Sequence, residues 1–225
     1  MEKAKELILA LDCSLRWTNV ALSRDGRILA SMQLDIGRRQ AAELPVLVQK
    51  LLGEAGRDWS DVGLVAVTNG PGYFTGTRIG VAYASALAYG LELQVVPVST
   101  LAMLAFRLEE RGGEVLSLVY AGRERVYASS FGSAAPLPAA EYAGEEIREW
   151  LSGHKNTRVI SDDPVRIEKT VSLTRPIEKI LPDAASVAQI AWNRKREALS
   201  PMALRINYHR DPDLGGAKKT EPAKR

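Results

Sequence analysis

Three consecutive polar residues, Asp12, Cys13 and Ser14, follow an apolar run typical of a buried β-strand. A carboxylate at a strand end can hold Mg²⁺, and a thiol or hydroxyl can act as a nucleophile when a base lies within reach. No second carboxylate accompanies Asp12 here, and neither of the two histidines follows a recognisable triad pattern. We therefore assign no catalytic, cofactor-binding or metal-binding residue. A Mg²⁺ site at Asp12 is the alternative to its use as an acceptor for backbone donors.

The glycine-rich segment 70–80, GPGYFTGTRIG, is the second candidate, because it joins an apolar run to residues at helical spacing. Backbone N–H groups at such a helix start attract anions, so a phosphate site is one interpretation. The spacing matches neither a Walker loop, which ends in Gly-Lys-Ser/Thr, nor a dinucleotide fingerprint. We expect instead a tight structural loop containing Gly70, Pro71 and Gly72, with Thr75 as the N-cap of the helix.

Small residues recur at every fourth position of that helix, at Gly76, Gly80, Ala84 and Ala88, and predict a thin ridge along one face. Glycine inside a helix costs about 1 kcal/mol relative to alanine, so close approach of another backbone must compensate. That neighbour is either the protein's own sheet or a helix of another subunit. Arg78 is either a surface charge or an arginine that reaches a carboxylate across an interface.

The elements that position these residues follow a repeated order. In the first half we expect strands at 7–12, 18–23 and 27–34, a helix at 42–55, a strand at 64–67, the glycine-loop helix, a strand at 94–98 and a helix at 100–110. In the second half we expect strands at 115–120, 126–131 and near residue 140, a helix at 144–151, a strand at 158–161 and a helix at 183–196. The repetition predicts a duplicated two-lobed α/β fold with mixed sheets flanked by helices.

We expect the first lobe at residues 1–110 and the second at 111–214, with the last helix of the second lobe a candidate to pack back on the first. Residues 215–225 are expected to form a disordered basic tail, because they hold four basic residues and one acidic residue. The rest of the chain carries 26 residues of each sign. Electrostatic contact of this tail with RNA is an alternative use of its charge.

Composition excludes several classes of protein. The 225 residues, 46% of them hydrophobic, are enough for two lobes with real cores. The single cysteine excludes an internal disulfide and a cysteine-rich metal site. The charged start and the lack of an apolar run of 18 residues predict neither a signal peptide nor a membrane span, so we expect a cytoplasmic protein.

Four segments carry a resemblance to a known family: ILALDCSLRWTNVAL, LPVLVQKLLGEAG, GPGYFTGTRIGVAYASALAYG and VVPVSTLAMLA. Together they resemble the TsaB, or YeaZ, family of partner subunits in bacterial threonylcarbamoyladenosine modification of tRNA. The similarity runs over most of residues 7–106, and its glycine-loop motif is highly specific. It implies the actin, hexokinase and Hsp70-like fold, also called ASKHA or ribonuclease H-like, which agrees with the duplicated order of elements.

The resemblance implies a non-catalytic subunit that binds and activates TsaD, which transfers the threonylcarbamoyl group to an adenosine of tRNA. It further implies a TsaE-like ATPase as a partner, a homodimer in isolation, only indirect contact with tRNA, and no cofactor for this chain alone. The interface is expected on the helices of the first lobe. Its expected residues are Leu44, Leu47, Leu51, Gly76, Arg78, Gly80, Ala84 and Ala88.

The sequence also departs from the family pattern. Arg39 or Gln40 stands where a histidine is common, and the segment 120–127 lacks the aspartate that the family often has there. The His-x-x-x-His ligand pair expected of the catalytic relative is absent from the chain. These residues favour an accessory subunit over an enzyme. The alternative from another class is a stand-alone nucleotide-binding enzyme of the same fold, of the ATPase or kinase type.

Overall fold

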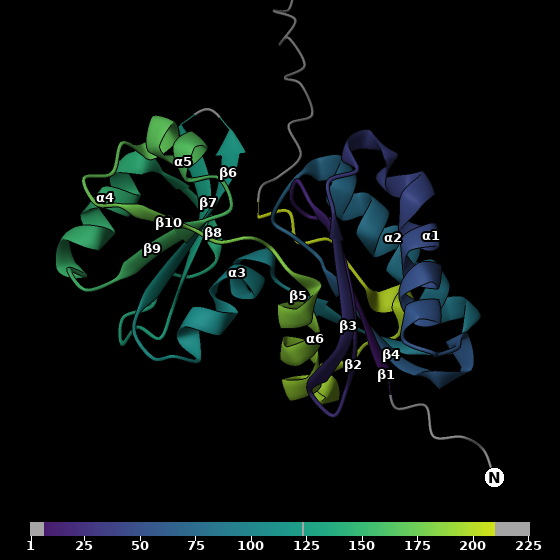
Figure 1. Cartoon of the computed structure of the whole chain (residues 1–225). Coiled ribbons are helices and arrows are strands. Elements are labelled where there is room, and N and C mark those ends of the chain that lie inside the picture. The colour runs from purple at the N-terminus through teal and green to yellow at the C-terminus, as the bar shows by residue number, and fades with distance from the viewer. Residues whose placement is uncertain (1–6, 123, 210–225) are drawn as a thin grey trace, which may run out of the picture.

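A computed structural model describes residues 7–122 and 124–209 and shows two lobes, each built on a five-stranded mixed sheet (Figure 1). The first sheet has the order β3-β2-β1-β4-β5. Strand β1 pairs antiparallel with β2 and parallel with β4. The strands are β1 (Leu7–Asp12), β2 (Thr18–Arg24), β3 (Arg27–Leu34), β4 (Val62–Thr68) and β5 (Gln94–Val98).

The second sheet repeats the first. Its order is β10-β9-β6-β7-β8, so the first strand of the lobe again lies between its antiparallel second strand and its parallel fourth strand. The strands are β6 (Val115–Gly122), β7 (Arg125–Phe131), β8 (Ala140–Ala143), β9 (Arg158–Ser161) and β10 (Ile177–Lys179). The predicted duplication and the predicted α/β class are confirmed.

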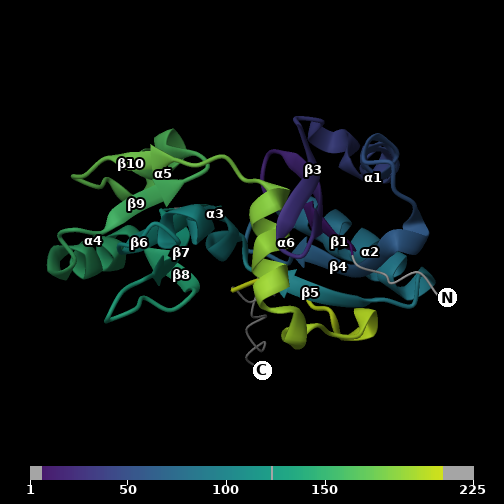
Figure 2. The same ribbon diagram turned by 60° about the horizontal axis from the view of Figure 1, so that its bottom comes forward.

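Helices cover both faces of the first sheet. Helices α1 (Gln40–Glu54) and α2 (Phe74–Gly90) form the outer layer, because α1 contacts β2 and β3 while α2 contacts β4 and β5. Helix α6 (Ala184–Asn193) packs on the opposite face, as the turned view shows (Figure 2). The leucines of α1 recur at helical spacing and are buried against the sheet, so the sequence pattern and the packing agree.

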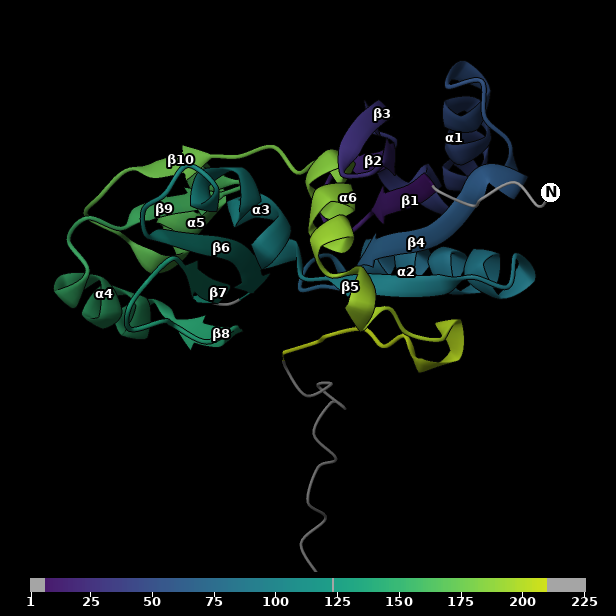
Figure 3. The same ribbon diagram turned by 90° about the horizontal axis from the view of Figure 1, so that it is seen from below.

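The second sheet is covered in the same way. Helices α4 (Gly144–Gly153) and α5 (Pro164–Val171) enclose one core, and α3 (Thr100–Glu109) packs on β6 and β7 from the other side. Helices α3 and α6 also pack on each other between the two sheets (Figure 3). One hydrophobic core therefore runs from the first sheet through both helices to the second sheet.

These contacts correct the two domain boundaries. The predicted first lobe, 1–110, includes α3, yet α3 covers the second sheet. The predicted second lobe, 111–214, includes α6, and this last helix does pack back on β1 and β2 of the first lobe, as expected from the sequence. The segment after α6 lies against the first lobe as well. The backbone of Leu199 exchanges two hydrogen bonds with Val95 of β5, at 2.9 and 2.8 Å, and the Asn207 N–H donates to Asn69 O at 2.8 Å. The predicted tail, 215–225, lies outside the described residues.

Short elements complete the fold. Four 3-10 turns lie at η1 (Gly37–Arg39), η2 (Trp59–Asp61), η3 (Lys195–Glu197) and η4 (Pro201–Ala203). Helix α5 and strand β10 were not expected from the sequence. Across the described ranges no helix has the length and apolar character needed to cross a membrane.

Candidate functional site at the glycine loop and the cleft between the lobes

The glycine loop leaves β4 and turns sharply into α2. Its Gly70–Pro71 peptide bond is cis, and Gly70 has a φ of 109°, a conformation that favours glycine. The Tyr73 N–H donates to Ser14 O at 2.7 Å, and the Thr100 N–H donates to Gly70 O at 2.9 Å. The loop is therefore fixed by backbone hydrogen bonds to the β1–β2 turn and to the start of α3.

Two glycines allow the loop and α2 to lie directly on the β1–β2 turn. A Cβ atom at Gly72 would stand 2.1 Å from Ser14 O, and one at Gly76 would stand 2.1 Å from Cys13 O. A Cβ at Gly80 would meet the Cys13 Cβ at 3.3 Å. The close approach that the glycines predict is thus made within the first lobe, against its own first strand and turn.

The predicted interface residues need a correction for this reason. The small-residue ridge faces the sheet of its own lobe, and the three leucines of α1 belong to the same buried core. A buried side chain is not available to a partner in the folded subunit. The residues corrected are Leu44, Leu47, Leu51, Gly76, Gly80, Ala84 and Ala88.

The start of α2 also differs from the prediction. The helix begins at Phe74, its N-cap residue is Tyr73, and no side chain caps it. The Thr77 N–H closes the first turn by donating to Tyr73 O at 2.9 Å. Thr75 is exposed in the first turn and is not the N-cap. The helix therefore starts two residues earlier than the capping pattern indicated.

Asp12 is fully buried and accepts four hydrogen bonds. Its Oδ1 accepts from Ser14 N at 3.0 Å, from Ser14 Oγ at 2.6 Å and from Thr68 Oγ1 at 2.7 Å, while its Oδ2 accepts from Asn19 Nδ2 at 2.8 Å. These donors stabilise a buried carboxylate without a metal. In the part of the chain that the structure describes, no group of three His, Cys, Asp or Glu residues is arranged to hold a metal ion.

The neighbouring thiol has little nucleophilic character. Burial, and secondly the charge of Asp12, raise the pKa of Cys13 far above its usual value. Only the thiolate is a strong nucleophile, so Cys13 acts as a small core residue beneath Gly80.

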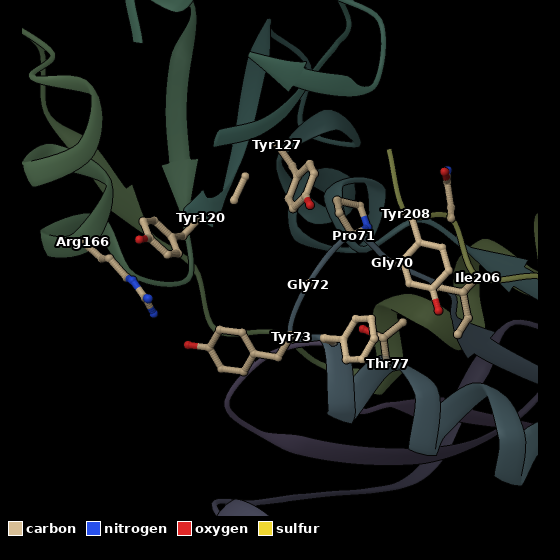
Figure 4. Close-up of a pocket in the computed structure, with 13 residues that line it drawn as sticks. Gly70, Pro71, Gly72, Tyr73, Thr77, Tyr120, Tyr127, Arg166, Ile206 and Tyr208 are labelled. Carbon is tan, nitrogen blue, oxygen red and sulfur yellow. The ribbon is translucent and has the colours of Figure 1, made fainter. Parts of the chain in front are cut away.

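A cavity of about 290 Å³ lies in the cleft between the lobes (Figure 4). The glycine loop and the first turn of α2 form one wall, and the C-terminal segment forms another. The second lobe faces them with Tyr120, Tyr127 and Arg166. The lining residues are Gly70, Pro71, Gly72, Tyr73, Phe74, Thr77, Tyr120, Ala121, Tyr127, Arg166, Ile206, Asn207 and Tyr208.

Two arginines stack on the rings of this cavity. The Arg166 guanidinium carbon lies 3.7 Å from the centroid of Tyr120, and that of Arg78 lies 3.5 Å from the centroid of Phe74. Arg78 Nε also donates to the Tyr208 hydroxyl at 2.9 Å. Arg78 therefore holds the C-terminal segment against α2, a role that the sequence did not indicate.

Asp162 directly follows β9 and lies close enough to Asp12 for their charges to interact. Burial raises its pKa to about 6, and the charges of Asp163 and Asp12 contribute in the same direction. The charge of Asp12 in the first lobe thus acts on a carboxyl group of the second lobe.

A family model described as TsaD, tRNA N6-adenosine threonylcarbamoyltransferase, matches residues 35–195. The chain belongs to this family. The match includes the glycine loop, both helices of the outer layer and the second-lobe strands of the cleft. Relatives named TsaB and a solved structure named YeaZ confirm the resemblance carried by the four sequence segments.

Several curated relatives carry the name tRNA threonylcarbamoyladenosine biosynthesis protein TsaB. That of Escherichia coli K12 is 36% identical over 122 residues, which are 53% of this chain and 52% of that protein. That of Bacillus subtilis 168 is 31% identical over 120 residues, again 53% and 52%. The match to this chain thus spans about half the length of these TsaB relatives.

A solved structure extends the likeness to the whole fold. YeaZ from Pseudomonas aeruginosa is 29% identical and covers 90% of this chain and 99% of its own, with a TM-score of 0.73. The YeaZ fold therefore includes the second lobe, where the sequence motifs are weaker.

Proposed function

We propose that this chain is a non-catalytic TsaB-like subunit that binds a TsaD-like catalytic subunit and activates it for threonylcarbamoyl transfer to adenosine in tRNA. The proposal includes a TsaE-like ATPase as a further partner, a homodimer in the absence of the catalytic subunit, no resident cofactor, and a cytoplasmic location. The names of the TsaB relatives support the modification pathway. The outer layer of the first lobe supports the role in binding.

The observation that carries the binding role is the apolar outer face of α1 and α2. Their inner faces are buried in the core, yet their outward faces also bear apolar side chains. Val46 of α1 is 62% exposed and Tyr89 of α2 is 69% exposed, while Ala82 and Ala86 of α2 and Pro45 of α1 are exposed beside them. Exposed apolar surface on two adjoining helices is typical of a protein–protein contact.

The residues that could do chemistry favour this role over the enzyme alternative. Both oxygens of Asp12 already accept hydrogen bonds, and the β1–β2 turn is filled by the buried side chain of Leu15. A phosphate-binding turn needs room for close backbone approach. Here that approach is made by Gly72 and Gly76 of the same chain.

The test is a substitution on the exposed side of α2. Ala86→Arg leaves the core unchanged, so the thermal midpoint should stay within a few degrees of that of the wild type. The complex with the organism's own TsaD-like subunit should weaken at least tenfold in co-purification and size exclusion. Val165→Arg is the matched control, because Val165 is an exposed apolar residue of the second lobe, at 61% exposure.

An Ala86→Arg chain that pairs as well as the wild type would contradict the assignment of this face. Calorimetry of the isolated chain with ATP and Mg²⁺ addresses the enzyme alternative. Micromolar binding there would favour a stand-alone nucleotide-dependent enzyme over the accessory subunit.

A further inference from the structure

The two lobes are joined where the chain leaves β5 and where it returns after β10. At the first crossing, the Asn69 N–H donates to Val98 O at 3.0 Å. The Thr100 N–H donates to Gly70 O at 2.9 Å. Val98 ends β5 and Thr100 begins α3, so Ser99 alone lies between the two bonded residues. The first crossing is therefore tied to the glycine loop on both sides of a single residue.

The return crossing is equally short. The Ile180 N–H donates to Ser161 O of β9 at 2.9 Å, which ties the start of the linker to the second lobe. Two residues later, Pro182 O accepts from Gln33 Nε2 of β3 at 2.6 Å, which ties the linker to the first lobe. Figure 3 shows this linker running from β10 to the start of α6 beside β3. Leu181 alone therefore spans the two lobes.

Proline restricts this single residue further. The ring of Pro182 fixes its own φ, and the residue before a proline is confined mainly to extended conformations. Leu181 and Pro182 thus have few backbone conformations open to them. Hinges between domains absorb large changes in φ and ψ over a few residues, and the bonded linker leaves no such stretch.

The Gln33 side chain is itself held from the other side. Its Nε2 also donates to Asn19 Oδ1 at 2.9 Å, and Asn19 Nδ2 donates to Asp12 Oδ2 at 2.8 Å. A carboxylate only accepts hydrogen bonds, so the Asn19 amide turns its NH2 group to Asp12 and its oxygen to Gln33. Both N–H groups of the Gln33 amide are then used, one on Asn19 and one on the linker. A relay of three side chains connects the buried Asp12 carboxylate to Pro182.

The residue after Pro182 is fixed as well. Asp183 is the N-cap of α6, and its Oδ1 accepts from the Ser186 N–H at 2.7 Å. Arg107 of α3 forms an ion pair with the same carboxylate at 3.4 Å. The linker is therefore bound to α3 and α6, the two helices that pack on each other between the sheets.

We propose that Gln33 acts as a latch that holds the linker to the first sheet and thereby keeps the two lobes at one angle. The subunit then presents a preformed two-lobed surface, and its cleft keeps a fixed width instead of closing on a ligand. A surface that is rigid before binding loses less conformational freedom when a partner covers both lobes. The latch belongs to the free chain, so it goes beyond the proposed function and holds whichever partner binds.

The test measures the distance between the lobes by double electron–electron resonance. Nitroxide labels at Lys50→Cys of α1 and Lys169→Cys of α5 lie on opposite lobes at exposed positions, whereas Cys13 is buried and takes no label. The chain with native Gln33 should give one narrow distance distribution.

Two variants of Gln33 remove the donors of the latch. Gln33→Met keeps the length of the side chain, and Gln33→Glu keeps its shape. The position is exposed, so both chains should fold with a nearly unchanged thermal midpoint. Each should broaden the distance distribution roughly twofold, because the linker regains a hinge. Ser31→Ala is the matched control, since Ser31 is exposed two residues away on the same strand, and it should leave the distribution unchanged.

Hydrogen exchange gives a second measurement of the same latch. The Ile180 amide should exchange about tenfold faster in Gln33→Met, the size of effect expected when one hydrogen bond no longer opposes local opening. The amides of β4 should exchange as in the wild type.

Two sets of results would overturn the inference. One is a second distance in the chain with native Gln33, alone or after addition of ATP and Mg²⁺, because it would reveal a working hinge. The other is native width and native exchange in both Gln33 variants, because the relay would then hold nothing. None of these measurements involves the TsaD-like subunit, so a failure of the proposed function in Ala86→Arg is recognised separately.

Discussion

The Asp12 carboxylate connects three segments of the first lobe. Its donors come from the β1–β2 turn at Ser14, from β2 at Asn19 and from β4 at Thr68. A hydrogen bond to a charged group contributes about 1.5–3 kcal/mol, and an unpartnered buried charge costs more. Asp12, which the sequence offered as a candidate metal ligand, thus stabilises the β1–β2 turn that the glycine loop contacts.

Asp162 gives the molecule a pH-dependent stability. Its pKa is about 6 in the folded chain and 3.8 in the reference state, so the folded state binds more protons between these values. Stability from this group is therefore complete below about pH 4, falls as the pH rises to about 6, and is level above about pH 7. Over this whole range the loss is roughly 3 kcal/mol in the free energy of unfolding.

Asp162→Asn should remove that loss. Urea unfolding at pH 4.5 and pH 7.5 measures it, with each variant compared with the wild type at the same pH so that other titrating groups cancel. The variant should gain roughly 2 kcal/mol on the wild type between the two pH values. An equal difference at both values would show that the Asp162 carboxyl titrates normally in the folded chain.

At the scale of elements, α2 can lie close to β1 because its glycines have no side chains in the way. Gly76→Ala places a methyl group 2.1 Å from a backbone oxygen, so the helix must shift. We expect a loss of roughly 3 kcal/mol in the free energy of unfolding, at the upper end of overpacking effects. Gly53→Ala in α1 is the control, because a Cβ there meets nothing within 4 Å, and it should stabilise by up to about 1 kcal/mol.

Chemical denaturation of the two variants tests whether the small-residue ridge packs on the protein's own sheet or on a helix of another subunit. A destabilised Gly76→Ala chain, with Gly53→Ala unaffected or improved, follows from packing on the chain's own sheet. If Gly76→Ala had wild-type stability but failed to bind its partner, Gly76 would belong to the interface after all.

The sequence predicted the order of helices and strands along the chain, but not which of them pack against each other. Nearly every strand was predicted, because apolar runs and turn signals are local. The four-residue spacing of Gly76 to Ala88 defined a helix face, but a spacing does not say which surface lies against it. Helix α5 has eight residues and β10 has three, too few for a clear period. The cavity rings lie on separate elements, so only the fold brings them together.

At the scale of the molecule, the two lobes share their middle layer. Helix α3 follows the first sheet in sequence and covers the second, whereas α6 follows the second sheet and covers the first. Val187 and Ile190 of α6 and Leu101 and Leu104 of α3 belong to one continuous core. Separation of the lobes would expose this layer to water, and its apolar area is a large part of what stabilises each sheet.

This shared layer predicts that the lobes unfold in one transition. Hydrogen exchange in increasing urea should show the amides of β4 and β6 losing protection at the same concentration. Ile190→Ala in α6 should lower both midpoints together, with a loss of about 3 kcal/mol typical of truncating a buried isoleucine. Val165→Ala on the exposed side of α5 is the control and should change neither. If Ile190→Ala lowered the midpoint of β4 alone, the lobes would be independent units, and the cleft between them would be free to open without unfolding.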